Sequence, residues 1–168
     1  MAHIHSFPPI TSSNSRVLIL GSVPSKVSLQ LNQYYGHQRN LFWDFIEQFL
    51  KIKREIDYSE RIIMLRKHGI AVWDVIKICT RTSSLDSDID NSTIETNSFN
   101  EFLLKHPKIK TICFNGAKAE SVFYKHVLPT LKYKGKINFI RLPSTSPANA
   151  SIPISVKLKE WKAVLLND

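Results

Sequence analysis

Strand-like and helical segments alternate along this chain, and the alternation predicts an α/β fold with three layers. Four short apolar runs have the character of β-strands, and segments of helical periodicity separate them. Strands that alternate with helices favour a mainly parallel sheet, with helices on both faces. With 168 residues, 43% of them hydrophobic, the chain is long enough for one domain with its own core. We therefore predict a single α/β/α domain, 1–168, around a central four-stranded sheet, with 1–15 as an N-terminal arm.

Each predicted strand is an apolar run that ends at a turn signal. The first ends at Gly21, and the third is followed by the turn Asn115-Gly116. The last leads into a loop with two prolines, 143–150. The strands are expected at 16–21, 69–75, 109–114 and 137–142.

Apolar periodicity and capping patterns place helices between these strands. From about Asn40, apolar residues recur at helical spacing as far as Leu50. Segments 57–60 and 98–101 each begin with a possible acceptor side chain and end with Glu, which is the pattern of a capping box at a helix start. Further helices are expected at 117–126 and at about 155–166.

The chain carries a large excess of positive charge. It has 23 Lys and Arg against 14 Asp and Glu, a net charge of +9. Such a balance favours polyanionic partners, because contacts with phosphates release bound counterions. Charge alone does not separate DNA from RNA or from an acidic membrane surface. No apolar run approaches the roughly 18–20 residues of a membrane helix, so a membrane-spanning segment is not expected.

The N-terminus and the cysteines indicate a reducing compartment and no metal site. The first residues lack the basic and apolar regions of a secretory signal peptide, so we expect a cytoplasmic protein, or a nuclear one in a eukaryote. Cys79 and Cys113 lack C-x-x-C spacing and are expected to be reduced thiols in the core. Two cysteines do not supply the four thiolates of an iron–sulfur cluster, and a metal site at His3 and His5 is not expected. The sequence predicts neither a metal nor an organic cofactor.

The loops beyond the carboxyl ends of parallel strands are where functional groups collect in such folds. A long polar connection, 79–97, is also of the kind that carries function. The turn 21–25 lacks the second glycine and the lysine of a phosphate-binding P-loop, and a dinucleotide fingerprint is absent too. By itself this turn fits an ordinary strand-to-helix connection equally well. The loops in question are 21–40, 74–81, 115–116 and 143–150.

Residues 34–43 combine aromatic rings, an imidazole, a guanidinium and a carboxamide at the entry of a helix. The apolar members are expected in the core, which leaves Tyr35, His37, Arg39 and Asn40 as candidates for a site. Asn40 has an alternative role as the N-cap of the helix that follows. Loop 143–150 contains three small hydroxyl residues and two prolines, so its backbone N–H groups could approach phosphates closely; an ordinary surface turn is the alternative.

Taken together, these segments resemble the uracil-DNA glycosylase superfamily, and most closely its branch of hypoxanthine (deoxyinosine) DNA glycosylases. The resemblance extends over nearly the whole chain, in several blocks that occur in the same order. The blocks are Phe7-Pro-Pro-Ile10, Gly21-Ser-Val-Pro24, Ser28-Leu29, Tyr34-Tyr-x-His-x-Arg-Asn40 with Phe42-Trp43, Trp73-Asp-Val75, Ser84-Leu-Asp86, His106-Pro107, Phe114-Asn-Gly116 and Leu142-Pro-Ser-Thr-Ser-Pro147.

Several positions depart from the pattern of that branch. In other branches the residue at position 23 is Asp or Asn and helps to activate water, but Val23 has no polar side chain. The resemblance therefore assigns this work to Asn40. The other departures are Val23 for Met, Ser25 for Gly, Gln38 for Pro, Ser83 for Gly, and Asn97-Ser-Phe99 for Asn-Asp-Phe.

The resemblance implies an enzyme that flips a damaged base out of the duplex and hydrolyses its glycosidic bond. Tyr35 is expected to stack on the base, and the turn Gly21-Ser22-Val23 to donate a backbone N–H to O6 of hypoxanthine. Asp74 is expected to accept N1–H, with a helix cap as its alternative role, and Asn115 completes the base-binding set.

The same resemblance assigns the remaining roles around the base. Asn40 would position water, and His37 would donate either to the base or to a phosphate. No lysine is assigned as a Schiff-base nucleophile, so the enzyme is expected to be monofunctional. The DNA-binding loop comprises Pro143, Ser144, Thr145, Ser146 and Pro147, and the expected phosphate contacts are Lys26, Arg39 and Arg141.

Two other functions remain open at this point. Uracil or xanthine could be the base that is removed, or the chain could be a nucleic-acid-binding module without catalysis. The intact Asn40 and Ser-Thr-Ser loop favour catalysis over the binding module. The expected partner is damaged DNA, single- or double-stranded, bound by a monomer without a metal.

Overall fold

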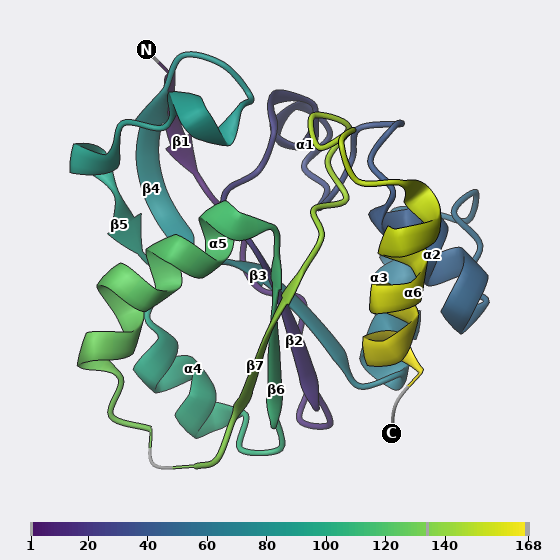
Figure 1. Cartoon of the computed structure of the whole chain (residues 1–168). Coiled ribbons are helices and arrows are strands. Elements are labelled where there is room, and N and C mark those ends of the chain that lie inside the picture. Colours follow the sequence, from purple (N-terminus) through teal and green to yellow (C-terminus); the bar gives the residue numbers. More distant parts are fainter. Residues whose placement is uncertain (1, 134, 167–168) are drawn as a thin grey trace.

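A four-stranded parallel sheet of order β3-β2-β6-β7 forms the centre of the protein (Figure 1). The computed structural model describes residues 2–133 and 135–166. Gly21 lies opposite Asp74 and Leu20 opposite Phe114, so the ends of the middle strands are in register. These strands lie where the sequence predicts them, and the α/β class is confirmed. Their bounds are β2 Val17–Gly21, β3 Ile70–Asp74, β6 Thr111–Asn115 and β7 Asn138–Leu142.

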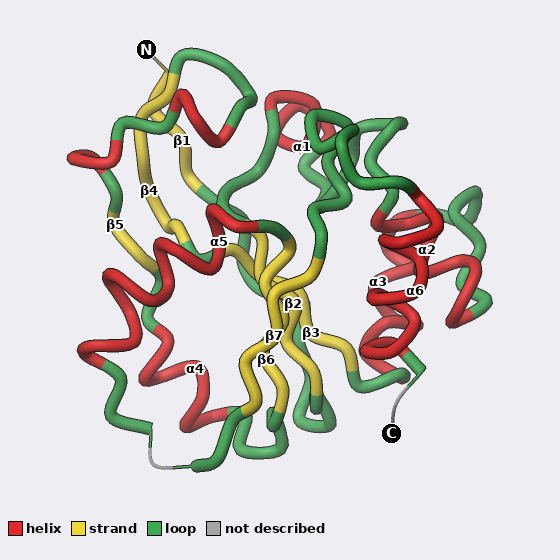
Figure 2. Tube along the Cα trace, in the orientation of Figure 1, coloured by secondary structure: helices red, strands yellow, loops and turns green. Residues whose placement is uncertain are grey.

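Helices cover both faces of the sheet (Figures 1 and 2). Side chains alternate along a strand, so Leu18 and Leu20 join one core cluster and Ile19 the other. The first cluster packs against α4 (Phe99–Lys105) and α5 (Ala117–Val122). The second packs against α2 (Phe42–Leu50), α3 (Tyr58–Lys67) and α6 (Ile154–Leu165). None of the helices described is long and apolar enough to cross a membrane.

Helix starts agree with the sequence better than the predicted caps do. α1 (Lys26–Leu31) is capped by Ser25, whose side chain accepts from the backbone N–H of Ser28 at 3.1 Å. α3 and α4 begin at the two capping-box patterns, but neither Asp57 nor Ser98 makes a side-chain cap hydrogen bond. The predicted capping bonds are therefore wrong, although the boundaries are right.

A small antiparallel sheet, β1-β4-β5, stands beside the main sheet and was not predicted. It is built from β1 (Ala2–His5), β4 (Ile76–Arg81) and β5 (Glu95–Thr96). Ile4 pairs with Cys79, and both are buried. The predicted arm, 1–15, thus contains strand β1. The predicted polar connection, 79–97, contains the end of β4 and the whole of β5. Strands this short alternate with polar residues and depend on pairing with distant segments, so their own sequence predicts them weakly.

Candidate active site

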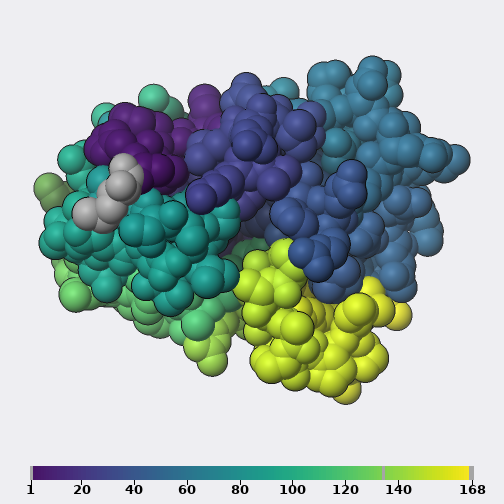
Figure 3. Space-filling model, turned by 90° about the horizontal axis from the view of Figure 1, so that it is seen from above, coloured from purple at the N-terminus to yellow at the C-terminus, as the bar shows by residue number. Residues whose placement is uncertain are grey.

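A cleft of about 990 Å³ opens at the carboxyl end of the parallel sheet. Figure 3 shows it as a hollow bordered by purple-blue, teal and yellow segments of the chain. Most of the predicted site residues line it, but Lys26 and Arg39 do not and are exposed outside it. Those that line it are Gly21, Ser22, Val23, Tyr35, His37, Asn40, Asp74, Asn115, Arg141, Pro143, Ser144, Thr145, Ser146 and Pro147.

The side chain of Asp74 lies at the end of β3, next to Gly21 in the register of β2. A Cβ atom at position 21 would stand 2.6 Å from Oδ1 of Asp74 and 3.2 Å from the hydroxyl of Tyr35. Glycine is therefore required at position 21 because any side chain would displace the carboxylate. β4 begins at Ile76, directly after this position, so Asp74 does not cap a helix.

The Asp74 carboxyl is buried, with only 3% of the residue exposed, yet its Oδ2 has no hydrogen-bond partner among the described residues. Burial raises its pKa above the ordinary value of 3.8, the nearby Asp86 raises it further and Arg81 opposes the shift, with a net value of about 7. A buried acceptor without a partner is costly and marks a position for a ligand donor. Asp74 can thus change between acceptor and donor near neutral pH.

Tyr35 has a left-handed backbone, with φ at 54°, and its ring stacks on Phe42 with centroids 4.2 Å apart. Its hydroxyl is buried and lacks a partner with hydrogen-bond geometry. Burial raises the pKa of this hydroxyl and Asp74 raises it further, while Asn115 opposes the rise. Phe42 therefore supports the ring from one side, and Tyr35 stands in the wall of the cleft.

The Asn40 side chain lies at the start of α2, where its Oδ1 accepts from the backbone N–H of Phe42 at 2.9 Å. The backbone around it is held by Arg54, which donates to the carbonyl oxygens of Asn40 at 3.0 Å and His37 at 3.1 Å. Arg54 also forms an ion pair with Asp44 at 3.0 Å. The N-cap of α2 is Leu41, so the capping role predicted as the alternative for Asn40 is wrong. The bond to Phe42 instead closes a turn just before the helix and fixes the orientation of the carboxamide.

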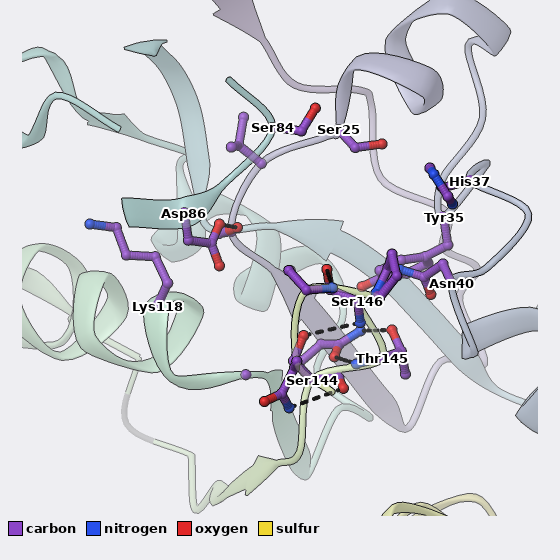
Figure 4. Close-up of a pocket in the computed structure, with 18 of the residues that line it drawn as sticks. Ser25, Tyr35, His37, Asn40, Ser84, Asp86, Lys118, Ser144, Thr145 and Ser146 are labelled. Carbon is purple, nitrogen blue, oxygen red and sulfur yellow. Dashed lines mark hydrogen bonds between the residues drawn. The ribbon is translucent and has the colours of Figure 1, made fainter. Parts of the chain in front are cut away.

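His37 lines the cleft with one ring nitrogen already engaged. Its Nδ1 accepts from the backbone N–H of Arg39 at 3.1 Å. The Nε2 atom remains for a substrate. Figure 4 shows His37, Tyr35 and Asn40 together on one side of the cleft.

Loop 143–150 is held in place by side chains from several elements (Figure 4). Asn115 donates to Oγ1 of Thr145 and accepts from its backbone N–H, both at 2.9 Å. The backbone N–H of Leu41 donates to the carbonyl of Thr145 at 3.0 Å, which ties the loop to the Asn40 segment. From α6, Trp161 donates to Pro143 O at 2.9 Å and Lys157 to Asn149 O at 2.6 Å. Thr145 is fully buried, so it anchors the loop.

Residues 81–86 hold the turn 21–25 from the other side. Ser22 donates its hydroxyl to Asp86 at 2.6 Å, and the backbone N–H of Lys26 donates to Ser84 Oγ at 3.0 Å. The buried guanidinium of Arg81 donates to the carbonyl of Pro24. In the part of the chain that the structure describes, no group of three or more His, Cys, Asp or Glu is placed to hold a metal ion.

Comparison with known proteins identifies the family of this chain. The sequence matches the model of the uracil DNA glycosylase superfamily over residues 8–167. The chain belongs to this superfamily. It is 35% identical over 159 residues to a hypoxanthine DNA glycosylase of Methanosarcina acetivorans, covering 94% of this chain and 95% of that protein. Identity to a hypoxanthine DNA glycosylase of Methanosarcina barkeri is also 35%, over 144 residues, 85% of this chain and 86% of that one.

The fold agrees with a solved structure of the same superfamily. The solution NMR structure of a Methanosarcina acetivorans protein assigned as a uracil DNA glycosylase superposes with a TM-score of 0.80 at 33% identity. The match covers 98% of this chain and 97% of that chain. The predicted uracil DNA glycosylase-like architecture is therefore confirmed.

Some residues of this candidate site were not predicted from the sequence. Ser84 and Asp86 fall in a block that signalled the superfamily, but no role was assigned to them. Lys118 also lines the cleft, where its Nζ donates to Asn91 at 2.6 Å. Arg54 and Arg81 act on backbone carbonyls that are remote in sequence, by 14 and 57 residues, and no local pattern marks such contacts.

Proposed function

We propose that the protein is a monofunctional DNA glycosylase that removes a deaminated base, hypoxanthine above all. The relatives named above support the substrate, since both are hypoxanthine DNA glycosylases. The observation that carries the proposal is the buried Asp74 carboxylate, with an oxygen free of partners at the wall of the cleft. Hypoxanthine has a hydrogen on N1, whereas adenine has a lone pair there. An ionised Asp74 accepts a hydrogen bond from N1–H of hypoxanthine and repels the N1 lone pair of adenine.

Base binding then follows from the walls of the cleft. Gly21 lets the Asp74 carboxylate lie close to the end of β2, and a backbone N–H of the turn at Ser22 and Val23 would donate to O6. Tyr35 provides an aromatic face, and stacking on such a face contributes about 1–3 kcal/mol per base. Both the amide nitrogen and the oxygen of Asn115 form hydrogen bonds with Thr145, so its role in the proposal is to hold loop 143–150 next to the base.

Bond cleavage requires a positioned water and stabilisation of the departing base. An sp² oxygen has two lone pairs, and Asn40 Oδ1 uses one of them on Phe42 N–H. The second is available to orient water toward the sugar. His37 Nε2 is available to donate to the base or to a phosphate.

DNA binding rests on the positive charge and on the rim of the cleft. Arg141 lines the cleft with 57% of its side chain exposed, and its ion pair with Glu120 is long, at 3.6 Å. Lys26 and Arg39 are exposed beside the cleft, where they can contact phosphates farther along the strand. All of these groups come from one chain, so the proposal needs only a monomer.

A substrate panel tests the proposal. The purified protein, in excess chelator, is expected to convert deoxyinosine in DNA to an abasic site that hot alkali then cleaves. Strand breaks without alkali would contradict the monofunctional assignment, and a requirement for divalent metal would contradict the proposed mechanism. Binding without cleavage of any base would favour the non-catalytic module.

Uracil and xanthine are the second candidates, because an ionised Asp74 also accepts the imino N–H of these bases. Deamination replaces a ring-nitrogen lone pair by an N–H in all three cases. Relative rates on matched duplexes that contain deoxyinosine, deoxyuridine or deoxyxanthosine rank them. A higher rate on deoxyuridine than on deoxyinosine would reassign the substrate without changing the reaction.

A further inference from the structure

Leu85 differs from the other exposed apolar side chains because it lines the cleft. Its residue surface is 48% exposed, so apolar area remains there for a partner to bury. Within residues 2–133 and 135–166, no other large hydrophobic side chain of this exposure lines the cleft. The exposed large hydrophobic residues are Leu31, Ile63, Leu85, Leu104, Tyr124, Leu128, Ile154, Val156 and Leu166.

The opposite rim of the cleft exposes less apolar side-chain surface: Ile152 lines it but is only partly exposed. Loop 143–150 exposes Pro147 and Ala148, which have less apolar bulk than leucine, while Thr145 is fully buried. A nucleotide that leaves a duplex opens a gap in the base stack, and proteins fill such gaps with apolar wedges. In Figure 4, Ser84 and Asp86, the neighbours of Leu85, lie across the cleft from Ser144 and Ser146. Leu85 is thus the most exposed of the large apolar side chains described along the cleft.

The turn that carries Leu85 is fixed by hydrogen bonds. The backbone N–H of Leu85 donates to Ser83 Oγ at 3.0 Å, and its carbonyl accepts from the backbone N–H of Asp88 at 3.1 Å. Ser83 also donates its hydroxyl to the Asp88 carboxylate. On either side of Leu85, Ser84 and Asp86 attach the turn to Lys26 and Ser22. A side chain presented in this way loses little freedom when it binds.

We propose that Leu85 is a wedge that enters the base stack of duplex DNA, from the side opposite to loop 143–150, when the damaged nucleotide moves into the cleft. The inference rests on the proposed function and adds a DNA-contacting residue to it. The leucine side chain is then buried between bases, and this burial offsets part of the stacking lost on extrusion. Single-stranded DNA has no duplex stack to restore, so Leu85 is not expected to contribute to cleavage of a single strand.

Comparison of single- and double-stranded substrates tests this role. For Leu85→Ala, single-turnover cleavage of deoxyinosine in a duplex is expected to fall roughly 10- to 100-fold, in keeping with the unstacking penalty that the wedge offsets. Cleavage of the same strand without its complement is expected to stay within about twofold, because no stack is opened there. Leu85→Met should retain the duplex rate. Leu104→Ala, an exposed leucine on α4 outside the cleft, is the matched control and should leave both rates unchanged.

The outcomes separate the wedge from other roles. An equal loss on both substrates would make Leu85 part of the base pocket, and no loss on either would remove its role; both overturn the proposal. If the wild-type protein cleaves neither substrate, the proposed function fails, and a 2-aminopurine placed beside deoxyinosine still tests the wedge. Its fluorescence should rise when the wild type binds the duplex and rise less with Leu85→Ala; an equal rise overturns the wedge. Thermal melting of each variant checks the fold.

Discussion

The side-chain oxygen of Asn40 has two lone pairs, and the fold uses one of them to accept from the backbone N–H of Phe42, in the turn that precedes α2. This bond orients the remaining lone pair. One residue thereby serves a local structural purpose and, in the proposed mechanism, a catalytic one. Substitutions that keep an acceptor for Phe42 N–H but lose the carboxamide distinguish the structural role from the catalytic role.

Asn40→Ser and Asn40→Ala form the matched pair for this question. Serine can accept the same backbone N–H of Phe42, whereas alanine leaves it without its acceptor. Both variants are expected to lower single-turnover cleavage by roughly two to four orders of magnitude, the usual contribution of a group that handles the reacting water. Only Asn40→Ala should melt at a lower temperature. If Asn40→Ser cleaves at the wild-type rate per folded molecule, Asn40 has only a structural role.

The protonation state of Asp74 predicts a pH dependence of base discrimination. Its carboxyl has a pKa of about 7, set by burial and by the charges of Asp86 and Arg81. Asp74 in turn raises the pKa of the nearby hydroxyls of Tyr34, Tyr35 and Tyr58. Above its own pKa Asp74 is an acceptor and suits hypoxanthine; below it Asp74 donates and no longer repels N1 of adenine. The ratio of deoxyinosine to deoxyadenosine cleavage should therefore rise between pH 6 and pH 8. Asp74→Asn should show no such rise, and a wild-type ratio independent of pH would contradict this role.

The same carboxyl predicts a pH dependence of stability. Its pKa is higher in the folded chain than the ordinary value of 3.8, so the folded state binds the proton more tightly. The stability that this proton contributes is present below 3.8 and is lost as pH rises through about 7. Asp74→Asn should therefore raise the melting temperature more at pH 8 than at pH 4. An equal change at both values would mean that Asp74 is not desolvated.

At the scale of elements, loop 143–150 depends on the pair formed by Asn115 and Thr145. Thr145→Val keeps the shape of the side chain but leaves an amide N–H of Asn115 without its acceptor. Loss of a buried partner costs about 1–3 kcal/mol, so the variant should unfold at lower denaturant concentration. Thr130→Val, which removes an exposed hydroxyl that donates to Val127 O, is the control and should change stability by less than about 0.5 kcal/mol. Equal midpoints for the two variants would refute the anchoring role.

The main sheet was predictable because each of its strands is an apolar run with its own turn signal; β2, β3 and β6 are largely buried, whereas β7 is partly exposed. β2 reads as Val-Leu-Ile-Leu-Gly, and its pattern needs no knowledge of its neighbours. β1 and β5 have only 4 and 2 residues, and each is a strand only by virtue of pairing with β4. Information about that pairing is distributed over segments that lie far apart in the chain.

The site shows the same division between local and distant information. Asn40, Asp74 and loop 143–150 were predictable because they follow strands or begin a helix, where a parallel sheet gathers functional groups. The contacts of Ser84 with Lys26 and of Asp86 with Ser22 span 58 and 64 residues. Nothing in the composition of 79–97 specifies which of its polar side chains faces the cleft.

For the whole molecule, the net charge of +9 predicts a salt-dependent affinity for undamaged duplex DNA. Each phosphate contact contributes a slope of about −0.9 to a plot of log K against log salt. Arg141→Ala should reduce the magnitude of the slope by about one. Arg66→Ala removes the same charge from the last turn of α3, outside the cleft, and should leave the slope unchanged. A wild-type slope near zero would contradict DNA binding through the cleft.

The strand order β3-β2-β6-β7 has a consequence for how this enzyme can change over time. The chain runs from β2 outward to β3 on one side and later returns to place β6 on the other side. The connections on the two sides of β2 leave toward opposite faces, so a crevice exists between them whichever side chains line it. The groups proposed to read the base lie at the ends of strands, as Asp74 does, and in the loops that follow, while stability resides in the buried strands and helices. Replacement of a few loop residues could therefore redirect the enzyme to another damaged base without the need to refold its core.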